Sequence, residues 1–155
     1  MSLIVDRLPF FEEATHVESP RGSVLVRPYQ IVLWANLSVA GKVSSSFPVI
    51  LDTGHTHNFS IREQQLAEWA PTITTNLRTI GFARVNKRPV MLKEAGIAIH
   101  RNVPGTRDSL AANYLLDLPQ GSAVHGRTDP FAPRLPLLGM RALVRNRLKL
   151  IIDGA

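Results

Sequence analysis

The stretch Phe47-Pro48-Val49-Ile50-Leu51-Asp52-Thr53-Gly54 decides how this sequence is interpreted. Its first five residues are apolar, a run that is long enough for a buried strand and too short for a helix. This predicted strand delivers the chain into Asp52-Thr53-Gly54. By itself the tripeptide is also typical of a turn after a strand, because Asp and Gly both suit such turns. Its meaning therefore depends on the residues that surround it.

Strands are predicted over most of the chain around this stretch. Residues 23–39 are rich in β-branched and aromatic side chains and show no helical period. The best helix signal follows the tripeptide, where Ser60 and Glu63 have the spacing of a capping box. Leu66 and Trp69 lie three apart on one face of this helix, and Pro71 ends the run. A second short helix is expected at 140–144 from its apolar spacing. The predicted fold class is therefore mainly β, with one or two short helices.

Two hairpins are predicted from turn residues between extended segments. The first spans 77–100, with a polar turn at Asn86-Lys87-Arg88. The second spans 114–125, around Pro119-Gln120-Gly121. A final strand is expected at 148–152, where apolar and polar residues alternate in part.

Composition limits the classes of protein that fit. The chain has 155 residues, which is about one domain. It has no cysteine, so a disulfide scaffold, a thiolate zinc site and a cysteine nucleophile are excluded. The net charge of +6 allows an anionic partner without requiring one. We see neither a signal peptide nor an apolar run approaching about 18 residues, so a cytoplasmic protein with no membrane partner is expected.

Three further features follow the tripeptide along the chain. Phe59-Ser60-Ile61 leads into the predicted helix, the long hairpin follows, and Leu137-Leu138-Gly139 opens the second helix. This arrangement resembles the retropepsin-like aspartic proteases, the single-lobe relatives of pepsin, and looks closest to their small bacterial members. The resemblance covers roughly residues 30–154 and is specific in the two short motifs. It implies a closed acid-protease-like β barrel of a single lobe at 29–155, with a flap hairpin, after an N-terminal arm at 1–28.

The resemblance implies an aspartic endopeptidase with Asp52 as its catalytic residue. In such enzymes two carboxyl groups hold one water, and one accepts its proton while the other protonates the substrate. Two carboxylates at ~3 Å cannot both ionise, so they share one proton. Because this chain has one Asp-Thr-Gly, the second carboxyl must come from another copy across a two-fold axis. We expect a homodimer acting on an extended peptide or protein substrate, with no cofactor.

The neighbours of Asp52 receive supporting roles from the same resemblance. Thr53 hydroxyls would interlock the two loops of the dimer, and Gly54 would let the substrate backbone approach closely because it has no Cβ. Leu137-Leu138-Gly139 would pack under the loop, with Gly139 admitting the crossing backbone.

The hairpin at 79–100 falls where the flap of the family lies, with its tip at Arg84-Val85-Asn86-Lys87-Arg88. A flap closes over an extended peptide and supplies hydrogen bonds to it. The family often has glycines at the tip, whereas this chain has Asn86-Lys87-Arg88. The basic side chains would favour acidic peptides as substrates, although a solvated hairpin tip explains them equally simply.

His55 is a second departure, because the family usually has a small residue after the glycine. It would either lie beside the catalytic carboxyl, where it could shift the pH range or narrow a substrate pocket, or be a partly exposed polar side chain. His55 and His57 could share a metal with Asp52, but no further ligand cluster lies near in sequence, so no metal is predicted.

Two other readings of the sequence stay open. The chain could be a catalytically silent domain of the same fold that binds peptides or serves for dimerisation. The basic cluster Arg141, Arg145, Arg147 and Lys149 could be a phosphate-binding face or a solvated surface. Aromatic residues are 6% of the chain and do not interleave with this cluster, so nucleic acid is not expected as a partner.

Overall fold

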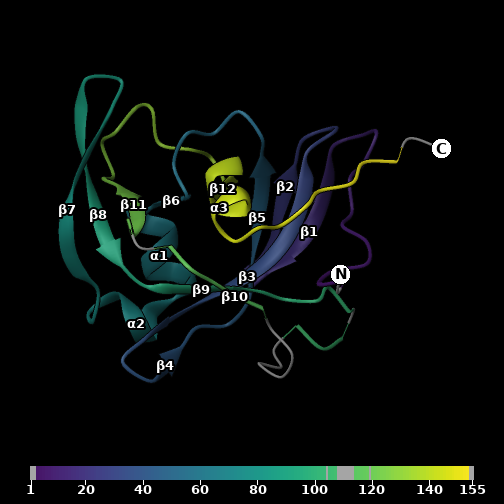
Figure 1. The fold of residues 1–155 in the computed structure, drawn as a ribbon, viewed down its shortest axis with the longest axis horizontal. Coiled ribbons are helices and arrows are strands. Elements are labelled where there is room, and N and C mark those ends of the chain that lie inside the picture. Colours follow the sequence, from purple (N-terminus) through teal and green to yellow (C-terminus); the bar gives the residue numbers. More distant parts are fainter. Residues whose placement is uncertain (1–2, 104, 108–113, 119, 154–155) are drawn as a thin grey trace.

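The computed structural model describes residues 3–103, 105–107, 114–118 and 120–153 (Figure 1). Short strands make up most of it. The strands are β1 (Thr15–Ser19), β2 (Gly22–Val26), β3 (Ile31–Val39), β4 (Lys42–Val43), β5 (Phe47–Asp52), β6 (Phe59–Arg62), β7 (Arg78–Val85), β8 (Arg88–Glu94), β9 (Gly96–Ile99), β10 (Tyr114–Leu116), β11 (Ser122–His125) and β12 (Leu137–Gly139). The helices are α1 (Glu63–Trp69), α2 (Pro71–Thr74) and α3 (Met140–Arg145).

One large sheet carries most of the strands. Its hydrogen-bonded order is β10-β9-β3-β5-β12-β6-β11-β8-β7, and β4 pairs with β3. The predicted mainly β class with few helices is confirmed. The expected closed barrel is not found in the described part of the chain, because β10 and β7 end the order and do not pair with each other. The long β7–β8 hairpin instead turns away from the rest of the sheet (Figure 1).

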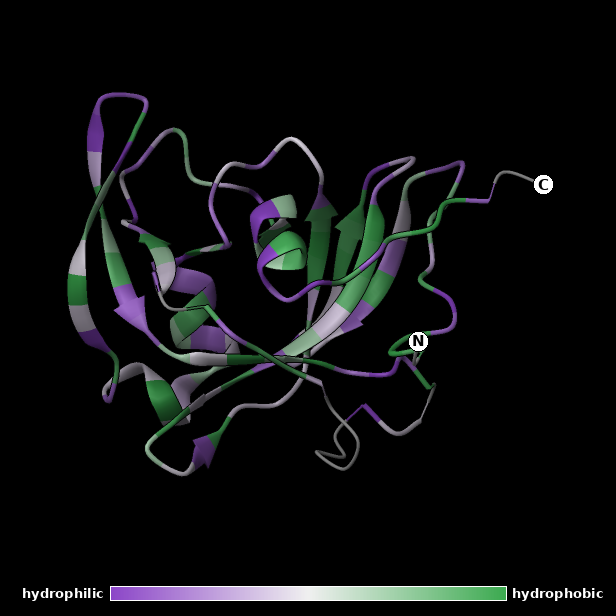
Figure 2. Cartoon of the chain, in the orientation of Figure 1, coloured by the Kyte–Doolittle hydropathy of each residue, from purple (hydrophilic) through white to green (hydrophobic). Residues whose placement is uncertain are grey.

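The centre of the sheet is formed by β5, β12 and β6. Strand β12 lies between the other two, parallel to β5 and antiparallel to β6. The five residues of β5 before Asp52 are all buried, and Phe47 and Val49 have no exposed surface. Figure 2 shows this apolar strand beside the apolar stretch of β3. A strand covered on both faces has this continuous apolar character, as the sequence indicated.

Helix α1 packs against this centre through the face that was predicted. Leu66 and Trp69 are buried, and the Trp69 ring lies 5.8 Å from that of Phe47. The predicted capping box is wrong, because Ser60 lies in β6 and α1 has no side-chain cap. Pro71 ends α1 but opens α2, since proline fits the first turn of a helix. No described helix has the length and apolar character needed to cross a bilayer.

The first predicted hairpin is confirmed over residues 78–94, but its second arm ends at Glu94, and residues 96–99 form β9, which pairs with β3 and β10 instead. The second predicted hairpin is wrong. Strands β7 and β8 pair from Arg78 with Glu94 to Val85 with Arg88. Strand β10 pairs with β9, however, and β11 is inserted between β6 and β8. Between these two partners all four residues of β11 are buried. The final strand expected at 148–152 does not form, and residues 148–153 run without regular structure.

The N-terminal segment packs on the same core. Strands β1 and β2 form a separate hairpin, in which Val17 and Val26 are buried. Before this hairpin, the Val32 N–H donates a 3.0 Å hydrogen bond to the Pro9 carbonyl. Residues 9–26 are therefore held against the domain rather than extended away from it.

Candidate active site

The candidate site is built on the tight turn that follows β5. Asp52 is partly exposed, and its Oδ1 accepts a 2.9 Å hydrogen bond from the Gly54 N–H. Its carbonyl accepts a 3.2 Å bond from the His55 N–H. Thr53 and Gly54 are exposed at the turn. Two bonds within four residues fix the direction in which the carboxyl group leaves the end of the buried strand.

The chain crosses itself directly beneath this turn, at Gly139. In the sheet Gly139 is paired with Asp52, and its N–H donates a 3.0 Å hydrogen bond to the Asn58 carbonyl. A Cβ on Gly139 would lie 2.2 Å from the His57 carbonyl oxygen and 2.7 Å from that of His55. Real Cβ atoms do not approach backbone so closely, so only glycine fits here. Leu138 beside it is completely buried.

The side chain of His55 contacts a buried hydroxyl. Its Nε2 lies 2.7 Å from the Oγ of Ser60, which has no exposed surface. The Ser60 hydroxyl, which was expected to cap a helix, thus contacts His55 in the loop instead. The His57 ring lies 5.7 Å from that of His55, so the two rings are neighbours in the loop.

The surroundings favour neutral histidines in this loop. Burial lowers the pKa of His55, His57 lowers it further, and nearby Asp52 offsets part of the effect. Burial also lowers the pKa of His57, as do His125 and Arg141. His55 and His57 are therefore close enough to other basic groups to be affected by them, and Asp52 offsets part of that effect at His55.

His125 is the buried member of this group. It ends β11, and its Nδ1 lies 2.9 Å from Oδ2 of Asp129. Burial by itself would raise the pKa of Asp129, but hydrogen bonds from His125 and the Phe131 N–H outweigh it and the pKa is lowered. Within the described residues, no three His, Asp or Glu side chains are arranged to hold a metal ion.

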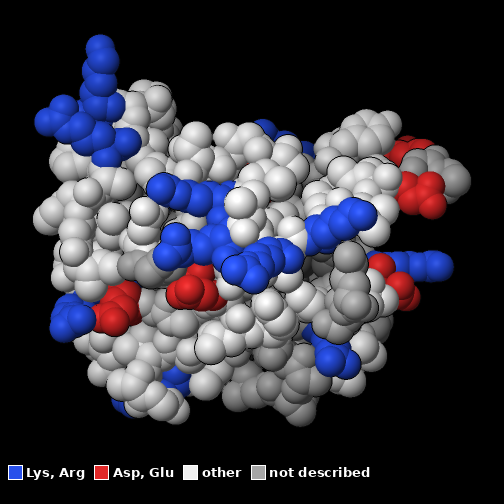
Figure 3. All heavy atoms as spheres, viewed as in Figure 1, with Lys and Arg blue, Asp and Glu red and all other residues white. Residues whose placement is uncertain are grey.

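The tip of the β7–β8 hairpin lies apart from the Asp52 turn. Asn86 and Lys87 form the two-residue turn with φ of 51° and 66°, which is the geometry of a tight hairpin with a right-handed twist. Arg88 places its guanidinium 5.8 Å from the Phe131 ring. Arg84, Lys87 and Arg88 are exposed, and Val85 is half-buried. The basic tip stands out from the molecule in Figure 3.

A pocket of about 350 Å³ lies between the hairpin, the loop after Asp52 and α3. Its lining residues are His57, Asn58, Phe59, Ile80, Ala83, Leu92, Gln120, Gly121, Ala123 and Arg141. Asp52 does not line it, although Asn58 holds Gly139 beside Asp52. Sequence reasoning missed Asn58 and placed Arg141 in a surface cluster. The position of Arg141 two residues after Gly139 was the signal that could have found it.

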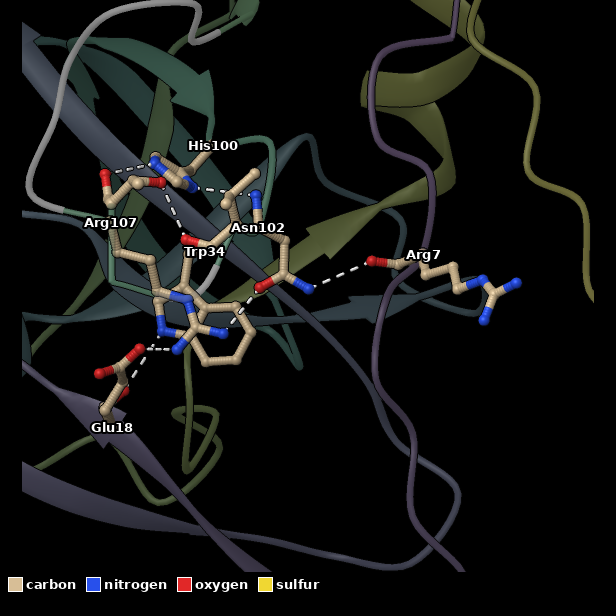
Figure 4. A network of polar contacts seen from close by, with 8 residues as sticks. Arg7, Glu18, Trp34, His100, Asn102 and Arg107 are labelled. Carbon is tan, nitrogen blue, oxygen red and sulfur yellow. Dashed lines mark hydrogen bonds and ion pairs between the residues drawn. The ribbon is translucent and has the colours of Figure 1, made fainter.

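A second polar cluster, on the other side of β3, is structural in character (Figure 4). The Arg107 guanidinium lies 3.5 Å from the centre of the Trp34 ring and forms an ion pair with Glu18. It also donates a 2.8 Å hydrogen bond to Asn102, whose amide donates to the Arg7 carbonyl at 3.1 Å. These contacts hold the N-terminal segment against the loop after β9.

Comparison with known proteins adds no relative: no family model, no curated protein and no solved structure matches the chain.

Proposed function

We propose that the protein is an aspartic endopeptidase of retropepsin-like fold that works as a homodimer, with Asp52 of each copy supplying one carboxyl group. The observation that carries the proposal is the crossing at Gly139. A buried strand ends in a carboxylate on a tight turn, and a second strand passes beneath that turn with no room for a side chain. This arrangement gives a carboxyl group a fixed position at a partly exposed edge.

The chemistry needs two such groups. One Asp52 accepts a proton from a shared water as the water attacks the peptide carbonyl, and the other donates a proton to the carbonyl oxygen. The proton taken from water then passes to the leaving nitrogen as the C–N bond breaks, and the proton on the former carbonyl oxygen returns to the other carboxyl group. Because water is the nucleophile, no covalent intermediate forms. Because the two carboxyl groups are coupled, the pH profile belongs to the pair and not to either residue.

The exposure of the turn supports assembly around a two-fold axis. Thr53 and Gly54 are exposed, so a second copy can approach Asp52 without unfolding of the strand. The same patch would then meet itself, as in any isologous dimer. The β7–β8 hairpin supplies the element that covers the substrate, since it ends the large sheet and its tip projects past the neighbouring strand β11 (Figure 1).

The test is cleavage of a library of extended peptides between pH 4 and pH 7. Asp52→Asn keeps the size of the side chain and should reduce kcat/KM at least about a thousandfold, because it removes proton transfer at the reacting atoms. Asp117→Asn is the control, since Asp117 is exposed and belongs to the segment between β10 and β11 rather than to the turn. Activity per subunit should also fall on dilution, because a monomer has only one of the two carboxyl groups. Cleavage that survives Asp52→Asn contradicts the mechanism.

A catalytically silent peptide-binding or dimerisation module is the second candidate. One observation favours it: Asp52 is not among the residues that line the pocket beside the hairpin. A statine-type transition-state analogue separates the two candidates, because its hydroxyl replaces the attacking water between the carboxyl groups. Binding that is lost in Asp52→Asn supports the enzyme. A folded dimer that binds peptides but not the analogue supports the module.

A further inference from the structure

The pocket beside the β7–β8 hairpin combines apolar walls with basic side chains. Ile80 and Ala83 from β7 and Leu92 from β8 face it from the hairpin. His57 and Arg141 face it from the loop after Asp52 and from α3. None of its lining residues is acidic. Its volume of about 350 Å³ is at the lower end of the range for small-ligand sites, and suits one side chain with part of a backbone.

Arg141 lines this pocket, and its positive charge has no partner among the described residues. It is exposed on α3, and no ion pair or hydrogen bond joins it to another described residue. It lies close enough to His57 to lower the pKa of that imidazole. Basic side chains also gather over α3 on the face shown in Figure 3. A carboxylate in the pocket would meet this guanidinium in a charge-assisted hydrogen bond.

Asn58 supplies an independent observation at the same place. It is 3% exposed and lines the pocket, and its Oδ1 has no hydrogen-bond partner in the described part of the chain. Buried polar atoms are nearly always paired, so an unpaired acceptor on a residue that lines a pocket calls for a donor from a ligand. A peptide N–H is such a donor.

We propose that this pocket is a subsite for a glutamate side chain of the bound peptide, with Arg141 holding the carboxylate and Asn58 accepting a peptide N–H. The two methylenes of glutamate match the apolar wall formed by Ile80 and Leu92. The proposal rests on the proposed function in taking a peptide as the ligand. It concerns the pocket beside α3 and not the exposed basic tip of the hairpin.

Binding is tested on the Asp52→Asn protein, which holds peptides without cleaving them. Fluorescently labelled ten-residue peptides carry one Glu, or one Gln in its place, at each position in turn, and affinity is read by anisotropy. At one position the Glu peptide should bind at least tenfold more tightly than its Gln twin. Arg141→Met should remove that difference, and Arg141→Lys should retain part of it.

Arg145→Met is the matched control, because Arg145 is exposed on the same helix and does not line the pocket. It should leave the preference for Glu unchanged. All variants are compared by thermal melting, so that a loss of fold is not mistaken for a loss of binding. Equal affinity of Glu and Gln peptides at every position overturns the proposal, as does equal loss of preference in the Arg145→Met and Arg141→Met proteins. Failure of the folded protein to bind any of these peptides overturns it too.

The wild-type protein separates this inference from the proposed function. If it cleaves nothing while the preference for Glu in binding persists, the endopeptidase is wrong and the subsite stands. If it cleaves peptides in an Asp52-dependent way with no preference for Glu, the subsite is wrong and the endopeptidase stands.

Discussion

The Asp52 turn and the β7–β8 hairpin are held in opposite ways. The turn joins two strands of the buried centre, and the backbone passes beneath it at Gly139 with no spare space. The hairpin is fixed along one edge only, where β8 pairs with β11, and Val90 is the one residue of β7 and β8 that is buried. Phe82 on β7 is 69% exposed.

The difference fits the two roles in the proposed function, a fixed carboxyl group and a hairpin that covers the substrate. A catalytic carboxyl group has to be positioned before the substrate arrives, and dense packing provides that. A covering element has to open, and segments with few buried contacts open at low cost in free energy. Matched substitutions in the two regions test whether they differ in this way.

The largest effect is expected from adding a methyl group to a glycine in each region. Gly139→Ala should lower the free energy of unfolding by about 3 kcal/mol or more, because its Cβ would overlap two backbone carbonyl oxygens. Gly81→Ala in the hairpin should change it by less than about 0.5 kcal/mol, because the nearest atom to its Cβ is 4.0 Å away. Urea unfolding of both proteins measures the difference. Equal costs would show that the crossing is not tight.

Truncation of one large side chain in each region should have the next largest effect. Leu138→Ala should cost about 2–5 kcal/mol, because Leu138 is fully buried and its loss leaves a cavity in the centre of the sheet. Phe82→Ala should stay within about 0.5 kcal/mol, because most of the ring is already in solvent. Thermal and urea unfolding measure both. A large cost at Phe82 would mean that another surface covers this ring in solution.

A smaller effect is expected at the hairpin turn itself. Lys87 has a φ of 66°, which glycine adopts without the steric cost of a Cβ, so Lys87→Gly should stabilise the hairpin by up to about 1 kcal/mol. Hydrogen exchange of the β7 and β8 amides should slow, while exchange in β5 stays unchanged. Lys42→Gly, at an exposed lysine of β4, is the control and should bring no gain. Slower exchange in both regions would show that they open together.

The smallest effect concerns pH and is confined to the Asp52 loop. His55 and His57 have pKa values below the ordinary 6.5 in the folded protein, chiefly because burial disfavours the charged ring. As the pH falls below 6.5, the unfolded chain therefore takes up these protons first, and stability that is complete above 6.5 is lost toward pH 5.

Unfolding in urea at pH 7.5 and pH 5.5 tests this prediction. His57→Gln should make the stability less dependent on pH, because it removes one of the two histidines. His16→Gln, at an exposed histidine of β1, should leave the dependence as it is. A wild-type protein that becomes more stable toward pH 5.5 would contradict the argument.

The features predicted correctly from sequence are those that depend on near neighbours. The apolar run before Asp52 identified a buried strand, and the polar residues at 86–88 identified a hairpin turn. Leu66 and Trp69 were placed on the buried face of a helix. Each of these depends on periodicity or turn geometry within a few residues.

Most of the failures involve pairing with a distant segment, although the strand expected at 148–152 does not form at all. Ser60 has the spacing of a helix cap, but β12 and β11 pair with the strand that contains it, and its hydroxyl meets His55. The hairpin expected around residue 120 is replaced by strands that pair with β9, β6 and β8. The pocket itself was missed, because its residues Asn58 and Arg141 are 83 positions apart in sequence (141 − 58 = 83).

The sequence by itself determined a mainly β chain with one acidic turn after an apolar strand, because these follow from local side-chain chemistry. Only the tertiary structure decided what surrounds that turn. In it β12 lies between β5 and β6, and Gly139 lies beneath Asp52. Among the described residues, β7 and β10 end the sheet and do not pair. The physical reason is that strand order is selected by burial and hydrogen bonding summed over the whole sheet, and no short window of sequence contains that sum.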